Sequence, residues 1–74
     1  MTVMLRLHPA LRSYVEGKPE LTAAPGASVR AVLSDAGIPV ELVAAVIVND
    51  EQRDKDYVLQ AGDRVRLLAV IGGG

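Results

Sequence analysis

The sequence has 74 residues, a formal net charge of −1, no cysteine and a single histidine, His8. A chain of this length has room for one small core, and these residue types exclude a zinc, iron–sulfur or thiol site, so we expect no metal and no bound cofactor. The near-neutral charge argues against a nucleic-acid partner. The sequence has no long apolar run and no signal-peptide pattern. These two features argue against a membrane partner and favour a cytoplasmic location.

The first third of the sequence predicts two strands. Residues 2–8 alternate between apolar and other side chains, as a half-buried strand does. Pro9 interrupts this pattern, and residues 10–17 are interpreted as a loop or irregular turn. A second, weaker strand is predicted for residues 20–24, which are closed by a Pro-Gly turn signal.

A short amphipathic helix is predicted for residues 29–36. Ser28 stands at the N-cap position, and apolar residues follow at helical spacing. Gly37 suits the left-handed position after the helix, and Pro39 prevents its continuation. Ala31 occupies the position at which Glu or Gln would complete a capping box.

The second half of the sequence predicts three more strands, over residues 44–48, 52–53 and 64–70. The β-branched residues of the first indicate a buried strand, and Asn49-Asp50 is a hairpin signal that leads to the second. In the last strand Val65, Leu67 and Ala69 share one face.

This order of elements predicts an α+β fold. The first and last strands are strongly apolar, as central strands are, and the helix must cover one face of the sheet. A mixed sheet of four or five strands packed on one main helix, the β-grasp arrangement, satisfies both constraints, whereas a ferredoxin-like fold would need a second helix. We expect a single domain over residues 1–71 and a flexible glycine tail over residues 72–74.

The tail consists of Gly72, Gly73 and Gly74. Glycine neither extends a strand nor packs a core, but a tail without side chains can thread a narrow channel and bring its carboxylate to another protein's active site. The four residues from Ile71 span roughly 13 to 14 Å when extended. We expect Gly74 to carry the reactive carboxylate and the two preceding glycines to thread the channel; the alternative is a frayed chain end.

Five short segments, spread over nearly the whole chain, carry a family resemblance. They are Leu7-His8-Pro9-Ala10-Leu11-Arg12, Pro25-Gly26-Ala27-Ser28-Val29, Val48-Asn49, Ala61-Gly62-Asp63-Arg64-Val65 and Gly73-Gly74. In this order they resemble the ubiquitin-like sulfur carriers, namely the small subunit of molybdopterin synthase and the thiamine-pathway sulfur carrier.

The resemblance implies a chemistry for the tail. An adenylyltransferase of the ubiquitin-activating type would use ATP to convert the Gly74 carboxyl to an acyl-adenylate. A sulfur donor, a sulfurtransferase, would then displace AMP and leave a thiocarboxylate. The sulfur would pass to an acceptor enzyme such as the molybdopterin synthase large subunit or thiazole synthase, so the chain would be a substrate or subunit and not an enzyme on its own.

The pathway is open at this point. The segment after the first strand, with Leu11-Arg12, is similar to the corresponding segment of the molybdopterin synthase small subunit, and this similarity favours molybdenum or tungsten cofactor synthesis. The Val70-Ile71 pair before the glycines is instead similar to the ending of the thiamine carrier. Three more functions fit the same residues: a carrier for amino-acid or tRNA thiolation, a protein modifier conjugated through Gly74, and a passive β-grasp interaction module.

A partner-binding face is predicted from the strand alternation. If the apolar set of each terminal strand faces the helix, the remaining side chains lie together on the open face of the sheet. Apolar residues mixed with arginine are typical of an interface core; the alternative is that the chain's own loops cover them. The residues expected to bind the partner are Met4, Arg6, Arg66, Leu68, Val70 and Ile71.

Overall fold

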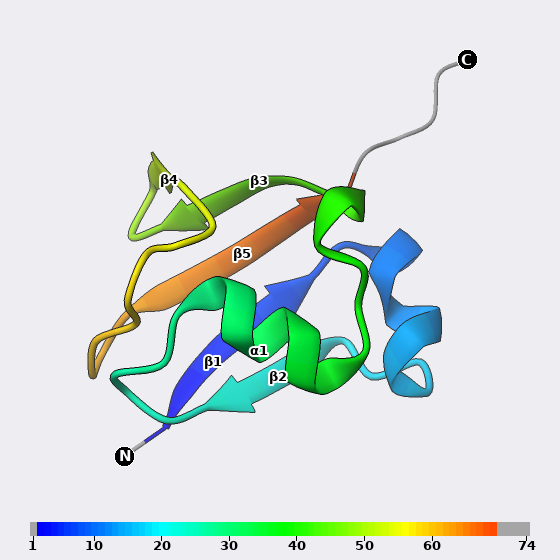
Figure 1. The fold of residues 1–74 in the computed structure, drawn as a ribbon, viewed down its shortest axis with the longest axis horizontal. Coiled ribbons are helices and arrows are strands. Elements are labelled where there is room, and N and C mark those ends of the chain that lie inside the picture. The colour runs from blue at the N-terminus through cyan, green and yellow to red at the C-terminus, as the bar shows by residue number, and fades with distance from the viewer. Residues whose placement is uncertain (1, 70–74) are drawn as a thin grey trace.

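The computed structural model describes residues 2–69, in which a five-stranded mixed sheet packs against one α-helix (Figure 1). The strands are β1 (Val3–Leu7), β2 (Glu20–Ala23), β3 (Val43–Val48), β4 (Glu51–Arg53) and β5 (Arg64–Ala69). The helix α1 covers Val29–Ala36, and two 3-10 helices cover Pro9–Val15 (η1) and Val40–Leu42 (η2). The predicted strands are all present, and their described ends agree with the prediction to within one residue.

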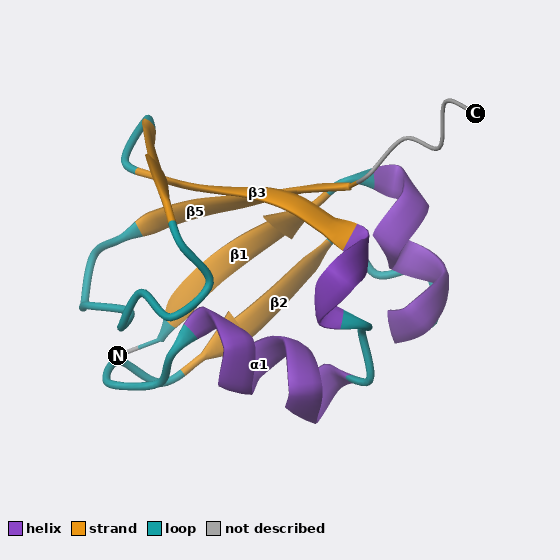
Figure 2. Cartoon of the chain, turned by 45° about the horizontal axis from the view of Figure 1, so that its top comes forward, coloured by secondary structure: helices purple, strands orange, loops and turns teal. Residues whose placement is uncertain are grey.

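The strand order across the sheet is β2-β1-β5-β3-β4. β1 and β5 run parallel, with Leu5 opposite Val65 and Leu7 opposite Leu67, and the other neighbours are antiparallel. The first and last strands of the chain, β1 and β5, therefore lie in the interior of the sheet, as their apolar sequences predict. Two parallel neighbouring strands need a crossover connection. The segment that connects β1 to β5 includes α1, which lies over one face of the sheet (Figure 2).

The core lies between the sheet and α1. Leu5 and Leu67 from the two central strands, together with Leu33 from the helix, are at most 1% exposed and belong to one continuous cluster. Residues of β1 and β5 alternate strictly between buried and exposed. This alternation places one set of side chains against α1 and the other on the opposite side of the sheet, which we call the open face.

The helix begins and ends where the sequence predicts. Ser28 Oγ accepts a hydrogen bond from the Ala31 N–H at 3.1 Å, which satisfies one of the free donors of the first turn. Gly37 follows the helix at a φ of 78° and donates its N–H to the Leu33 and Ser34 carbonyls. A residue with a Cβ is strained at this φ, so the glycine defines the helix end.

Residues 9–15 correct the prediction of a loop or irregular turn, because they form the 3-10 helix η1. Pro9 starts it with a preset φ, and the His8 Nδ1 accepts the Ala10 N–H at 3.0 Å. Leu11 and Val15, four residues apart, both enter the core. An apolar pair at this spacing directly after a proline is compatible with a helical turn, but it is too short to establish a helical period from the sequence.

Candidate partner-binding face

The structure brings together four of the predicted site residues on the open face. Met4 and Arg6 come from β1, and Arg66 and Leu68 come from β5. Met4 is 48% exposed and Leu68 is 39% exposed. Within residues 2–69 no loop covers these two side chains, so the alternative that the chain's own loops bury this face does not apply to them.

The other predicted site residues lie outside the described part of the chain. They are Val70, Ile71, Gly72, Gly73 and Gly74. The predicted partner-binding role of the first two and the predicted chemistry of the glycines therefore stay predictions. What the structure does place is Ala69, the buried last residue of β5, from which the sequence continues to Gly74.

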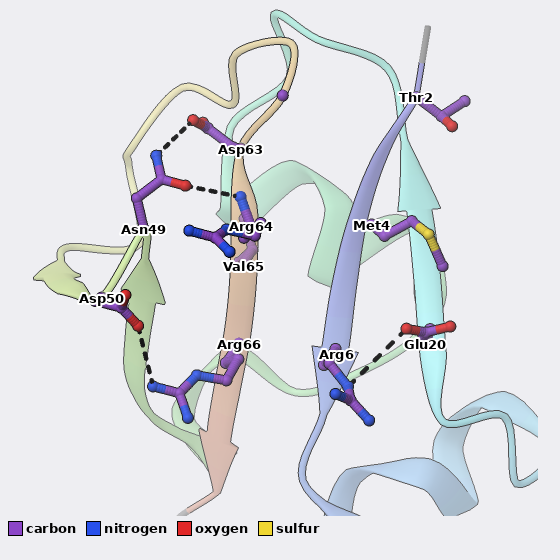
Figure 3. A pocket seen from close by; sticks show the side chains of 11 residues that line it. Thr2, Met4, Arg6, Glu20, Asn49, Asp50, Asp63, Arg64, Val65 and Arg66 are labelled. Carbon is purple, nitrogen blue, oxygen red and sulfur yellow. Dashed lines mark hydrogen bonds and ion pairs between the residues drawn. The ribbon is translucent and has the colours of Figure 1, made fainter.

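The register of the two central strands sets the charge pattern of the open face. Arg6 lies directly opposite Arg66, and Met4 lies opposite Arg64. Two like charges at paired positions on neighbouring strands repel each other. Figure 3 shows the result: the guanidinium groups of Arg6 and Arg66 turn away from each other, toward opposite edges of the sheet.

Each of these two arginines faces a carboxylate on its outer side. Arg6 Nε lies 4.0 Å from Glu20 Oε2 on β2, and Arg66 Nη2 lies 3.9 Å from Asp50 Oδ1 in the β3–β4 turn. Between them is an open hollow of about 460 Å³, which Arg64 also lines (Figure 3). We call this feature the arginine hollow and define it by Arg6, Arg64 and Arg66.

Arg64, Glu20 and Asp50 are among the residues of this site that the sequence reasoning missed. Arg64 shares a face with Arg66 in the strand alternation, which is the signal that would have included it. Glu20 and Asp50 carry no such signal, because they reach the hollow only through the pairing of β2 with β1 and through the turn after β3.

A polar network supports the rim of the hollow at the β3–β4 turn. Asp63 Oδ1 accepts a hydrogen bond from Asn49 Nδ2 at 3.0 Å, and Asp63 Oδ2 accepts from the Tyr57 hydroxyl and the Gln60 N–H, both at 2.9 Å. Asn49 Oδ1 in turn accepts the Arg64 N–H at 3.0 Å. The network thereby connects the turn that carries Asp50 to the start of β5.

The same network shifts two pKa values in opposite directions. Burial acts to raise the pKa of Asp63, but the hydrogen bonds from the Gln60 N–H, Tyr57 and Asn49 together outweigh it, so the pKa lies below its usual value. For Tyr57, the hydrogen bond to Asp63 is the main cause of a raised pKa, with burial adding to it. Both shifts favour an ionised carboxylate held by a neutral phenol.

Residues 2–69 carry neither a cluster of metal-ligating side chains nor a membrane-spanning helix. In that range, His, Asp and Glu side chains nowhere gather in a group of three that could hold a metal ion. None of the helices described there has the length and hydropathy needed to cross a bilayer.

Comparison with known proteins identifies the family. The sequence matches the ThiS family model over residues 7–74. No curated protein matches it significantly.

Several solved structures share the fold. SAMP1 from Haloferax volcanii aligns with a TM-score of 0.65 at 20% identity, over all of both chains. The HVO 2177 protein from the same organism aligns with a TM-score of 0.69 at 22% identity, over all of this chain and 87% of that one. At these identities the two structures show the fold alone.

A third structure is the complex of subunits 1 and 2 of the molybdopterin-converting factor from Helicobacter pylori 26695. One of its chains aligns with a TM-score of 0.64 at 25% identity, over all of both chains. The β-grasp, ubiquitin-like fold predicted from the sequence is therefore confirmed. With the family model covering nearly the whole sequence, the chain belongs to the ThiS family of ubiquitin-like sulfur carriers.

Proposed function

We propose that this protein is a cytoplasmic sulfur carrier for molybdopterin synthesis, for the molybdenum or the tungsten cofactor. The observation that supports this pathway is the likeness, at 25% identity over both whole chains, to a chain in the molybdopterin-converting factor complex. In this proposal residues 1–71 form the domain that docks on partners, residues 72–74 form the tail, and the chain is a substrate or subunit and not an enzyme on its own.

The proposed chemistry takes place at the Gly74 carboxylate, and the match to the ThiS family model extends through this residue. A carboxylate is a poor electrophile, so the adenylyltransferase transfers AMP from ATP to it and releases pyrophosphate. A sulfide-level nucleophile from the sulfurtransferase then forms a C–S bond as the bond to AMP breaks. The thiocarboxylate that results is the sulfur donor for the acceptor enzyme.

The carrier itself contributes docking. ATP is bound by the adenylyltransferase, and the carrier holds no cofactor of its own. The open face supplies exposed apolar and cationic side chains, of which Met4, Leu68 and Arg66 are examples. A docked domain makes the reaction of its tail effectively unimolecular, which is how positioning lowers the barrier. Val70 and Ile71 extend the docking segment toward the tail in this proposal.

A second candidate is a carrier for thiazole formation in thiamine synthesis. The observation that favours it is the Val70-Ile71 pair before the glycines, where the sequence is similar to the thiamine-pathway carrier. Both candidates use the same activation of Gly74 and differ only in the acceptor enzyme.

The test begins with a measurement of the protein's intact mass after incubation with ATP, a cognate adenylyltransferase and a sulfur donor. Replacement of one oxygen by sulfur is the expected result, and one residue added after Gly74 should abolish it. A ladder of lysine-linked adducts would instead identify a protein modifier, and no change with verified partners would leave a passive interaction module.

The acceptor is then decided by supplying the thiocarboxylated protein to each candidate enzyme. We expect sulfur transfer with a molybdopterin synthase large subunit and its precursor, and none with thiazole synthase. The reverse pattern would reject the molybdopterin proposal and support the thiazole candidate.

A further inference from the structure

The arginine hollow holds three guanidinium groups with weak internal compensation. Arg6 and its partner Glu20 are 72% and 37% exposed, and Arg66 and its partner Asp50 are 58% and 84% exposed. At 3.9 to 4.0 Å these pairs lie at the outer limit of an ion pair, and exposed pairs of this kind contribute little. Among residues 2–69, no carboxylate lies within ion-pair distance of Arg64.

The geometry leaves the centre of the hollow open to an incoming anion. Arg6 and Arg66 are register partners on parallel strands, yet each is turned outward (Figure 3). A carboxylate placed between them would relieve their repulsion and accept hydrogen bonds from both forks, which are well matched to carboxylate geometry. Such an anion would replace two loose internal contacts with closer ones.

The surroundings favour a protein segment over a small free anion. Met4 lies in the same hollow, and Leu68 lies on the same face of β5, two residues beyond Arg66. These exposed apolar side chains gain from burial against another protein, which inorganic phosphate cannot provide. Glu20 and Asp50 at the rim would also repel a dianion more strongly than a single carboxylate.

We propose that the arginine hollow binds an acidic segment of the adenylyltransferase, in which one Asp or Glu carboxylate bridges Arg6 and Arg66 and an apolar neighbour packs on Met4. The proposal rests on the proposed function in one respect only, that the partner is the enzyme that activates Gly74. The charges of Glu20 and Asp50 then serve as removable counter-ions that the partner's carboxylate displaces.

The central experiment compares two double charge reversals that change the net charge equally. Arg6→Glu with Arg66→Glu alters the hollow. Arg30→Glu with Arg53→Glu alters the other side of the molecule, since Arg30 lies on α1 and Arg53 is the register partner of core-facing Val46. Dissociation constants for the adenylyltransferase are measured by calorimetry at several salt concentrations, with circular dichroism to check the fold.

We expect the hollow variant to bind about tenfold more weakly or worse, with a shallower salt dependence than the wild type, because charge-assisted contacts across the interface are lost. The dissociation constant of the control variant should stay within about twofold of the wild-type value. Equal losses in both variants, or no loss in the hollow variant, would overturn the proposal. If Arg30→Glu unfolds the control, Arg53→Glu alone compared with Arg66→Glu alone makes the same comparison.

Two further measurements test the role of the guanidinium fork and the binding of a free anion. Arg6→Lys with Arg66→Lys keeps the charge but removes the planar fork, so we expect binding weaker than the wild type and stronger than the reversal. Inorganic phosphate at matched ionic strength should cause no saturable amide shifts around the hollow. Saturable shifts that the reversal abolishes would assign the hollow to a small anion and overturn the protein-segment proposal.

The outcomes also distinguish this inference from the proposed function. If the wild-type protein is not thiocarboxylated by verified partners, the proposed function fails. If the wild type is thiocarboxylated, and the hollow variant reacts at the same rate at carrier concentrations below saturation, the hollow proposal alone fails.

Discussion

Asn49 and Asp63, fourteen residues apart in the chain, are joined by a 3.0 Å hydrogen bond from Asn49 Nδ2 to Asp63 Oδ1. Asn49 sits at the turn after β3 with a φ of 52°, and its Oδ1 accepts the Arg64 N–H at the start of β5. The pair therefore ties the β3–β4 turn to β5. Because this turn presents Asp50 and the strand presents Arg64 and Arg66, the pair determines the shape of one side of the arginine hollow.

Replacing Asp63 tests this structural role. Asp63→Asn cannot accept all three side-chain and backbone donors that reach the carboxylate, so we expect a loss of about 1 to 2 kcal/mol in the free energy of unfolding, measured in urea. Asp35→Asn is the matched control, because Asp35 is exposed on α1. Within residues 2–69 its side chain makes no hydrogen bond and no ion pair. The control should change stability by less than about 0.5 kcal/mol, and equal losses would show that charge alone matters.

The lowered pKa of Asp63 predicts a pH dependence of stability. The unfolded chain has the ordinary value, near 3.8, and the folded chain has a lower one, so the unfolded state binds more protons as pH falls between the two. The contribution of Asp63 is therefore fully present above the unfolded value and is lost as pH falls through the folded value. Urea unfolding of the wild type and Asp63→Asn from neutral to acidic pH should show a stability gap that narrows in this window. A gap that stays constant would contradict the assignment.

Two neighbouring residues of β1, Leu5 and Met4, should lose very different amounts of stability when truncated. Leu5 is 0% exposed and Met4 is 48% exposed, so Leu5→Ala should cost about 2 to 5 kcal/mol of unfolding free energy, while Met4→Ala should cost less than about 0.5 kcal/mol. In a domain this small the first loss can approach the whole stability. Thermal and urea unfolding measure both variants. A large loss from Met4→Ala would mean that its side chain is not free for a partner.

The apolar part of the open face can be tested apart from its arginines. Leu68→Asp places a charge where the partner is expected to bury an apolar side chain, so we expect weaker binding to the adenylyltransferase with an unchanged fold. Val58→Asp is the control, because Val58 is also an exposed apolar residue but lies in the loop before β5. Comparable losses of affinity in the two variants would remove Leu68 from the interface.

Much of the fold follows from local patterns. The period-two alternation of β1 and β5 determines which side chains enter the core, because successive residues of a strand point to opposite faces. Ser28 and Gly37 define the ends of α1 through their own backbone chemistry. The 3-10 helix η1 was not predicted, because its apolar pair, Leu11 and Val15, covers too few turns to establish a helical period.

The sequence by itself determined the α+β class, the faces of the central strands and the candidate residues Met4, Arg6, Arg66 and Leu68. Only the tertiary structure decided that Arg6 lies opposite Arg66, that Glu20 and Asp50 flank them and that Asn49 meets Asp63. The physical reason is that alternation is a property of one strand, whereas strand order, register and turn contacts depend on how distant segments pair to bury a common core.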